Sequence, residues 1–206
     1  MSSPTRSAED LLGYAIHATD GDIGKVIDLY FDDQRWAVRY LVVDTGGWLT
    51  GRKVLISPRA ITGSADDEKV LPVSLTKGQV QHSPDIDTDK PVSRQHEAEH
   101  LGYYEYPFYW GGSGLWGMGE YPGDLSSQTA IEAELRAGET DAAPDSRADS
   151  HLQSFNALKK TQPCTSDGEL CRVEDMIVDQ RSWAIREFVV NASGKVVHVP
   201  PAGLTF

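Results

Sequence analysis

The chain has 206 residues, 39% of them hydrophobic, and a formal net charge of −12 at pH 7. A chain of this length forms one ordinary domain or two small ones. Its acidic balance repels phosphate backbones, so we expect no nucleic-acid partner. No apolar run approaches the roughly 20 residues that cross a bilayer, and residues 1–6 lack the apolar core of a signal peptide. We therefore expect no integral membrane segment and a cytoplasmic location.

One segment of the sequence occurs twice. Residues 18–26 correspond to residues 165–173, and adding 147 to a position in the first copy gives its match in the second. Matched pairs include Asp28 and Asp175, Asp32 and Asp179, Trp36 and Trp183, Arg39 and Arg186, and, after a five-residue contraction, Lys53 and Lys195. A unit of about 60 residues is marginal by itself. We therefore expect two homologous halves that share an interface and fold into one pseudo-symmetric object.

The first copy is rich in β-branched and aromatic residues arranged in short runs. Asp20-Gly21 predicts a tight hairpin turn, because Gly tolerates positive φ freely and Asp tolerates it better than most residues. Strands are predicted over residues 26–31, 37–43, 53–56 and 69–73. This pattern predicts an all-β (mainly β) fold of two small β-barrels related by internal duplication.

Between the copies the chain changes character. Residues 92–101 contain neither Pro nor Gly and predict one short helix. Residues 103–119 carry a density of Tyr, Trp and Gly that free linkers rarely have, so their aromatic rings need a surface to lie on. The predicted organisation is a first barrel over residues 8–80, a connector over 81–122, an acidic, disordered linker over 123–150 and a second, C-terminally truncated barrel over 151–206.

The second copy ends soon after its match to Pro58 and Ala60, so nothing in it corresponds to the strand at residues 69–73. A missing strand leaves an open edge with unpaired backbone groups. We expect the second barrel to be completed by the linker, by the first copy or by another subunit.

The segment His96-Glu97-Ala98-Glu99-His100 matches the zinc-protease pattern H-E-x-x-H, which on a helix places both imidazoles on one face. A catalytic zinc also needs a third protein ligand and a cleft, and neither is evident in the sequence. The alternative is a solvated acidic helix whose histidines form local hydrogen bonds.

Asp85, Asp87 and Asp89 are spaced like the start of a calcium loop. Lys90 replaces the Gly that such a loop needs at its sixth position, and His96 replaces the bidentate Glu of the twelfth. We therefore assign these carboxylates to turns.

Arg39 and Arg186 occupy matching places in otherwise apolar strands. A repeated Arg can bind an anion, but it more often pairs with a local carboxylate, for which Asp28 and Asp175 are the matched candidates. His198 falls on Ile56 in the repeat, and we expect it to lie in the barrel wall, bonded to backbone.

Cys164 and Cys171 become direct cross-strand partners if Asp167-Gly168 forms a two-residue turn, so a disulfide is the alternative to two free thiols. A hydrogen-bonded register and a reducing cytoplasm disfavour the bond. No nucleophile elbow or phosphate loop is present. We predict no enzyme, and no catalytic, cofactor-binding or metal-binding residue.

Both copies resemble the PRC-barrel family, the small β-barrel named after the cytoplasmic domain of the photosynthetic reaction-centre H subunit. The resemblance is carried by residues 18–26, 36–44 and 51–58, and more weakly by residues 165–202. Residues 83–97 with the Tyr/Trp cluster resemble the connector of tandem bacterial members. The resemblance implies a barrel used for binding and assembly rather than catalysis.

The leading hypothesis is therefore a soluble, non-enzymatic PRC-barrel protein that acts as a protein-binding or assembly module with an unknown partner. We expect it to form a homodimer through its open edge and aromatic connector, and to need no cofactor. The alternative is a peripheral protein, like the reaction-centre H subunit, that assists photosynthetic electron or proton transfer. A zinc-dependent hydrolase at His96, Glu97 and His100 is the third hypothesis.

Overall fold

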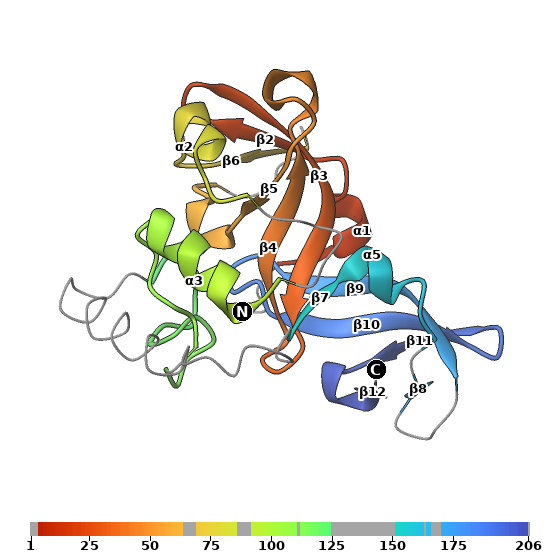
Figure 1. Cartoon of the computed structure of the whole chain (residues 1–206). Coiled ribbons are helices and arrows are strands. Elements are labelled where there is room, and N and C mark those ends of the chain that lie inside the picture. Colours follow the sequence, from red (N-terminus) through yellow and green to blue (C-terminus); the bar gives the residue numbers. More distant parts are fainter. Residues whose placement is uncertain are drawn as a thin grey trace.

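The computed structural model describes residues 4–63, 69–85, 92–110, 112–124, 151–162, 164–165 and 170–205. We call the described residues between 4 and 124 the first half and those between 151 and 205 the second half. The described chain is mainly β, as the sequence predicts (Figure 1). The described residues exclude residues 125–150 of the predicted linker, Asp87, Asp89, the Asp167-Gly168 turn and the side chain of Cys164.

The first half contributes a sheet with the strand order β5-β4-β3-β2-β6. Its strands are β2 (Ala15–Ala18), β3 (Gly21–Asp32), β4 (Ala37–Asp44), β5 (Lys53–Ile56) and β6 (Val70–Pro72). Short helices and 3-10 turns connect or cover them: η1 (Gly46–Leu49), η2 (Pro58–Ala60), α2 (Lys77–Gln81) and α3 (Arg94–Tyr103). The helix predicted over residues 92–101 is confirmed by α3. No helix among the described residues is long and apolar enough to span a membrane.

The second half contributes β9 (Cys171–Asp179), β10 (Ile185–Ala192) and β11 (Lys195–Val199) to a four-stranded sheet. A small separate ladder pairs β8 (Cys164–Thr165) with β12 (Leu204–Thr205), next to η3 (Pro201–Gly203). Among the described residues both main sheets are open. The two closed barrels expected from the sequence are therefore not confirmed.

Each half sends its first strand into the sheet of the other half. The first arm consists of β1 (Thr5–Ser7) and α1 (Ala8–Leu11), and β1 pairs antiparallel with β9. The second arm consists of β7 (Leu152–Ser154) and α5 (Phe155–Leu158), and β7 pairs antiparallel with β3. Figure 1 shows α5 and β7, in cyan, lying against the orange β3 of the other half. The first copy thus supplies a strand to the second sheet, one of the three outcomes that the sequence predicts, but the exchange is mutual.

The two long hairpins are built by the same local chemistry. Asp32 Oδ1 accepts hydrogen bonds from the backbone N–H groups of Gln34 and Arg35, which closes the turn between β3 and β4. Asp179 Oδ1 does the same for Arg181 and Ser182 between β9 and β10. Trp36 and Trp183 end these turns with φ values of 53° and 60°. A carboxylate that satisfies two turn amides explains why Asp recurs at this place.

The ends of the two hairpins meet at the centre of the molecule. Ala37 and Ala184 face each other as an antiparallel bridge. Val38 N donates to Trp183 O at 2.9 Å, and Ile185 N donates to Trp36 O at 2.7 Å. Behind this bridge the apolar side chains of both halves form one continuous core. Each half therefore buries its apolar surface against the other, which offsets the small core that either has alone.

Candidate functional site

Helix α3 covers the outer face of the first sheet. It begins after Ser93, whose Oγ accepts from His96 N, and it packs over a second apolar cluster. This cluster consists of Tyr30, Tyr40, Val42, Leu55, Val92 and Leu152. His100 Nε2 lies 3.0 Å from the Leu55 carbonyl oxygen, and the His100 ring meets the Tyr40 ring edge-on. The edge strand β5 is thereby closed over by a helix of the same half.

The residues of the H-E-x-x-H segment do not converge on one point. His96 is exposed and its ring lies beside Ser93 Oγ, whereas Glu97 and His100 are buried. The expected solvated helix is therefore wrong for Glu97 and His100, because the connector and sheet enclose that side of α3. Burial lowers the pKa of His100 to about 4, so the ring is neutral at pH 7 and its Nε2–H donates to Leu55.

Glu97 joins three parts of the chain inside the protein. The Tyr109 hydroxyl donates to Glu97 Oε1, and His151 Nε2 lies 3.3 Å from Glu97 Oε2 and 3.2 Å from the Tyr109 oxygen. Arg94 approaches the same carboxylate at 3.7 Å. Burial, followed by the charge of Glu97, raises the pKa of Tyr109 well above its usual range. This cluster ties α3 and the connector to His151, at the start of the second arm.

The arginine pairs differ from the expected ones. Arg39 Nη2 lies 3.0 Å from Asp32 Oδ2, with both side chains almost completely buried. Arg186 pairs in the same way with Asp179 at 2.7 Å, although 55% of its side chain is exposed. The expected partners, Asp28 and Asp175, instead accept hydrogen bonds from the opposite arms.

The Arg39 pair shifts the acidity of its carboxylate. Burial alone would raise the pKa of Asp32, but the Arg39 charge and the turn N–H donors outweigh burial and lower it. Burial also raises the pKa of Asp179, but bonds from Ser182, Arg186 and Arg181 lower it to about 2. Both pairs hold hairpins in place, which is the structural role predicted for the repeated arginines.

Arginines of the first half also hold the Gly-rich connector. Arg35 donates to Gly112 O at 2.9 Å, Arg39 to Leu115 O at 2.7 Å, and Arg59 to Trp116 O at 2.8 Å. The Arg39 guanidinium also stacks over the Tyr109 ring at 3.9 Å and the Trp116 ring at 4.9 Å. A Cβ on Gly112 would lie only 2.2 Å from the Gly117 carbonyl oxygen, so this packing requires glycine.

The connector aromatics are thus used within the chain. Phe108, Tyr109, Trp110 and Trp116 are all buried, and Trp116 Nε1 donates to Ser182 O of the second half at 2.7 Å. The surface on which they were expected to lie is the protein's own. Tyr103 and Tyr121 of the connector are exposed, and self-association through the aromatic connector stays a prediction.

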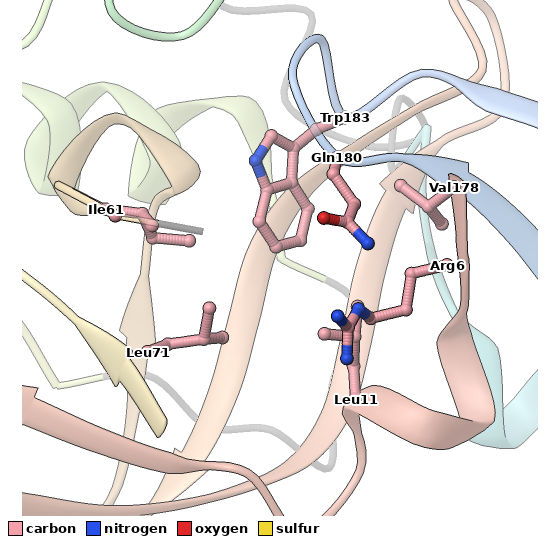
Figure 2. Close-up of a pocket in the computed structure, with 8 residues that line it drawn as sticks. Arg6, Leu11, Ile61, Leu71, Val178, Gln180 and Trp183 are labelled. Atoms are coloured by element: carbon pink, nitrogen blue, oxygen red, sulfur yellow. The ribbon is translucent and has the colours of Figure 1, made fainter. Parts of the chain in front are cut away.

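A small cavity lies where the two halves meet (Figure 2). Its walls come from both halves: Arg6, Leu11, Ile61, Gly63, Leu71, Val178, Gln180 and Trp183. Its volume is about 30 Å³, enough for one or two water molecules, whereas small-molecule sites span roughly 300–1,000 Å³. Arg6 bonds to the Tyr14 hydroxyl beside it. Sequence reasoning did not find this cavity, because its residues are scattered over both halves.

His198 lies on the outer face of the second sheet and not in a barrel wall. It is opposite Val189 on β10, and its Nδ1 lies 2.8 Å from Glu187 Oε1. In the first sheet Leu55 is opposite Val42, the residue that matches Val189. His198 therefore takes the place of Leu55 rather than of Ile56, and the expected backbone bond is replaced by a side-chain pair.

The outer edge of the second sheet is the main structural difference between the halves. Val54 on β5 is 2% exposed, whereas its match on β11, Val197, is 38% exposed, and the neighbouring Val196 is 57% exposed. Strand β11 is also the last strand of its sheet in the described chain. An exposed edge strand with apolar side chains is a template for pairing with another strand. We therefore take the edge of β11 (Lys195–Val199) as the candidate binding surface.

Comparisons with known proteins identify part of the chain. Residues 4–80 match the family model described as PRC-barrel domain. A stretch of 85 residues is 34% identical to a protein of Deinococcus radiodurans that carries the name "Uncharacterized protein". The match covers 41% of this chain and 30% of that relative, so the chain spans less than a third of the relative's length.

Proposed function

We propose that this protein is a non-enzymatic binding and assembly module made of two PRC-type β units. The first unit contains the matched residues 4–80, and the second is the shorter half that begins at residue 151. Support for the second unit comes from its hairpin, in which Asp179, Trp183 and Arg186 repeat the geometry of Asp32, Trp36 and Arg39.

The observation that carries the binding role is the contrast between β5 and β11. The two strands occupy the same place in their sheets, each paired with the second strand of the long hairpin. Helix α3 covers β5, while the matching strand β11 is exposed along residues 195–198. We infer that an extended segment of a protein partner adds to this edge, with main-chain bonds giving affinity and the exposed valines giving apolar contact.

The enzymatic alternative has less support from the geometry. Glu97 and His100 are enclosed by the sheet and connector, while His96 is exposed beside Ser93 at the start of α3. The cavity between the halves presents Arg6 and Gln180 as its polar lining groups, and its volume suits only water. These contacts favour structural roles for the ionisable side chains that the sequence singled out.

A selection of displayed random peptides on the immobilised chain tests the proposal. We expect extended peptides to be enriched, and Val196→Lys to weaken their binding at least tenfold, because a charge on an edge strand opposes strand addition. Met118→Lys is the matched control, since Met118 is 61% exposed but lies in the connector. Peptides that bind the two variants equally well would show that β11 is not the binding surface.

A further inference from the structure

The strand pairings and the central bridge between the two halves come in reciprocal pairs. Adding 147 to the first-half residue of one contact and subtracting 147 from its second-half residue gives the two residues of the reciprocal contact. Thr5 is opposite Asp179 in one sheet, and Leu152 is opposite Asp32 in the other. Such an arrangement, in which residue i contacts j and the match of j contacts the match of i, is the property of a two-fold, self-complementary interface.

The hydrogen bonds of the arms follow the same rule. Ser7 Oγ donates to Asp175 Oδ2, and Ser154 Oγ donates to Asp28 Oδ2. Glu9 N donates to Asp175 Oδ1 at 3.1 Å, and its counterpart Asn156 N donates to Asp28 Oδ1 at 3.0 Å. Gln180 N donates to Pro4 O at 2.9 Å, and its counterpart Asp33 N donates to His151 O at 3.0 Å. At the centre Ala37 faces its own match, Ala184.

From this reciprocity we infer that the partner which fits the interface between the halves is a second copy of this chain. In the assembly, the first half of one copy pairs with the second half of the other, and both interfaces keep the contacts seen within one chain. The inference rests on the proposed function, in which the halves are homologous units. It gives that module two β11 edges in one particle, and so a bivalent binding surface.

Two features make this exchange a closed dimer rather than a chain of many copies. All of the arm and hairpin contacts are satisfied once two first halves meet two second halves, so no half is left over. The connector travels with the first half, because Arg35, Arg39 and Arg59 hold it there, and it brings its Trp116–Ser182 contact to whichever second half is present.

The bridge between Ala37 and Ala184 provides the test. The bonds from Val38 N to Trp183 O and from Ile185 N to Trp36 O flank the pair, so it is a non-hydrogen-bonded pair whose Cβ atoms lie close enough for a disulfide. One full-length chain carries Ala37→Cys and a second, differently tagged, carries Ala184→Cys. Both have Cys164→Ala and Cys171→Ala, and the two are unfolded together, refolded and oxidised.

The expected result is a disulfide-linked dimer that carries both tags. An intrachain connection gives an effective concentration on the order of millimolar, so the linked fraction should rise roughly in proportion to total protein between about 10 and 100 µM. Each single variant refolded alone should give no such dimer.

The control is one chain that carries both Ala37→Cys and Ala184→Cys, which should link within itself. If this chain links and the mixed chains never do, the exchange is overturned while the proposed binding at β11 stands. If even the double variant fails to link, the interface described here is itself wrong.

Discussion

Two Asp–Arg pairs place the same two residue types in different surroundings. The Asp32 and Arg39 side chains are 3% and 0% exposed, whereas Arg186 lies more than half in solvent beside Asp179. A buried charge that loses its partner is costly, while an exposed charge is solvated by water. The two halves therefore supply an internal comparison of burial at fixed chemistry.

We predict that Asp32→Asn lowers the free energy of unfolding by about 3–5 kcal/mol, because it leaves the Arg39 guanidinium buried without its carboxylate. Asp179→Asn should cost about 1 kcal/mol or less, since water screens Arg186. Both variants keep an oxygen that can accept the turn N–H bonds. Urea denaturation measures the difference, and equal losses would show that burial of the pair does not matter.

His100 predicts a loss of stability in mild acid. Its folded pKa of about 4 lies below the unfolded value of 6.5, so its contribution is fully present above pH 6.5 and is lost as the pH falls toward 4. The loss amounts to about 3 kcal/mol. His100→Gln keeps a donor for Leu55 O and does not titrate. Its free energy of unfolding should fall less between pH 7 and 4.5, and an unchanged pH dependence would contradict the assignment.

At the scale of elements, each arm is held by the same pair of groups, a Ser of the arm and an Asp of the opposite half. Ser7 and Ser154 each accept from the first turn of their own short helix and donate to an Asp of the opposite half. Helices of a single turn are not stable in isolation. The arms therefore depend on docking, and these serines connect helix formation to docking.

Ser7→Ala and Ser154→Ala should each lower the free energy of unfolding by about 1–2 kcal/mol through the lost cap and the lost bond. Hydrogen exchange should speed up over residues 5–11 in the first variant and over residues 152–158 in the second. Ser93→Ala removes the cap of α3 within one half and serves as the matched control. If Ser93→Ala increased hydrogen exchange in both arms as strongly as the arm variants do, Ser7 and Ser154 would have no specific role in docking the arms.

The sequence predicts the strands and helices better than it predicts which strands pair with one another. Its β-branched runs located β3, β4, β5 and β6, and the absence of Pro and Gly located α3. The exchange of arms could not be found this way, because residues 5–7 and 152–154 are too short to show a strand period. For the same reason Asp28 was paired with Arg39, although it faces Ser154 across the interface. Spacing along one strand cannot show that its neighbour comes from the other half.

At the scale of the whole molecule, the internal match at 147 residues predicted two halves with a common interface, and the contacts agree with it. The sequence aligns the two copies one residue off after residue 43, where the second copy is contracted. The burial of β5 is not repeated in β11, so the pattern of apolar residues does not indicate the correct alignment. The sequence indicates an open edge in the second half only because nothing there corresponds to the strand at residues 69–73. Its exposure follows from the lack, in the described second half, of a helix equivalent to α3.

The central claim is that the halves are held together by reciprocal contacts and not only by their covalent connection. A protease recognition sequence placed within residues 125–150 allows that connection to be cut in the folded protein. The account predicts that light scattering after cleavage, at low protein concentration and without denaturant, still gives one particle near 22.6 kDa. Two separate fragments under the same conditions would contradict it.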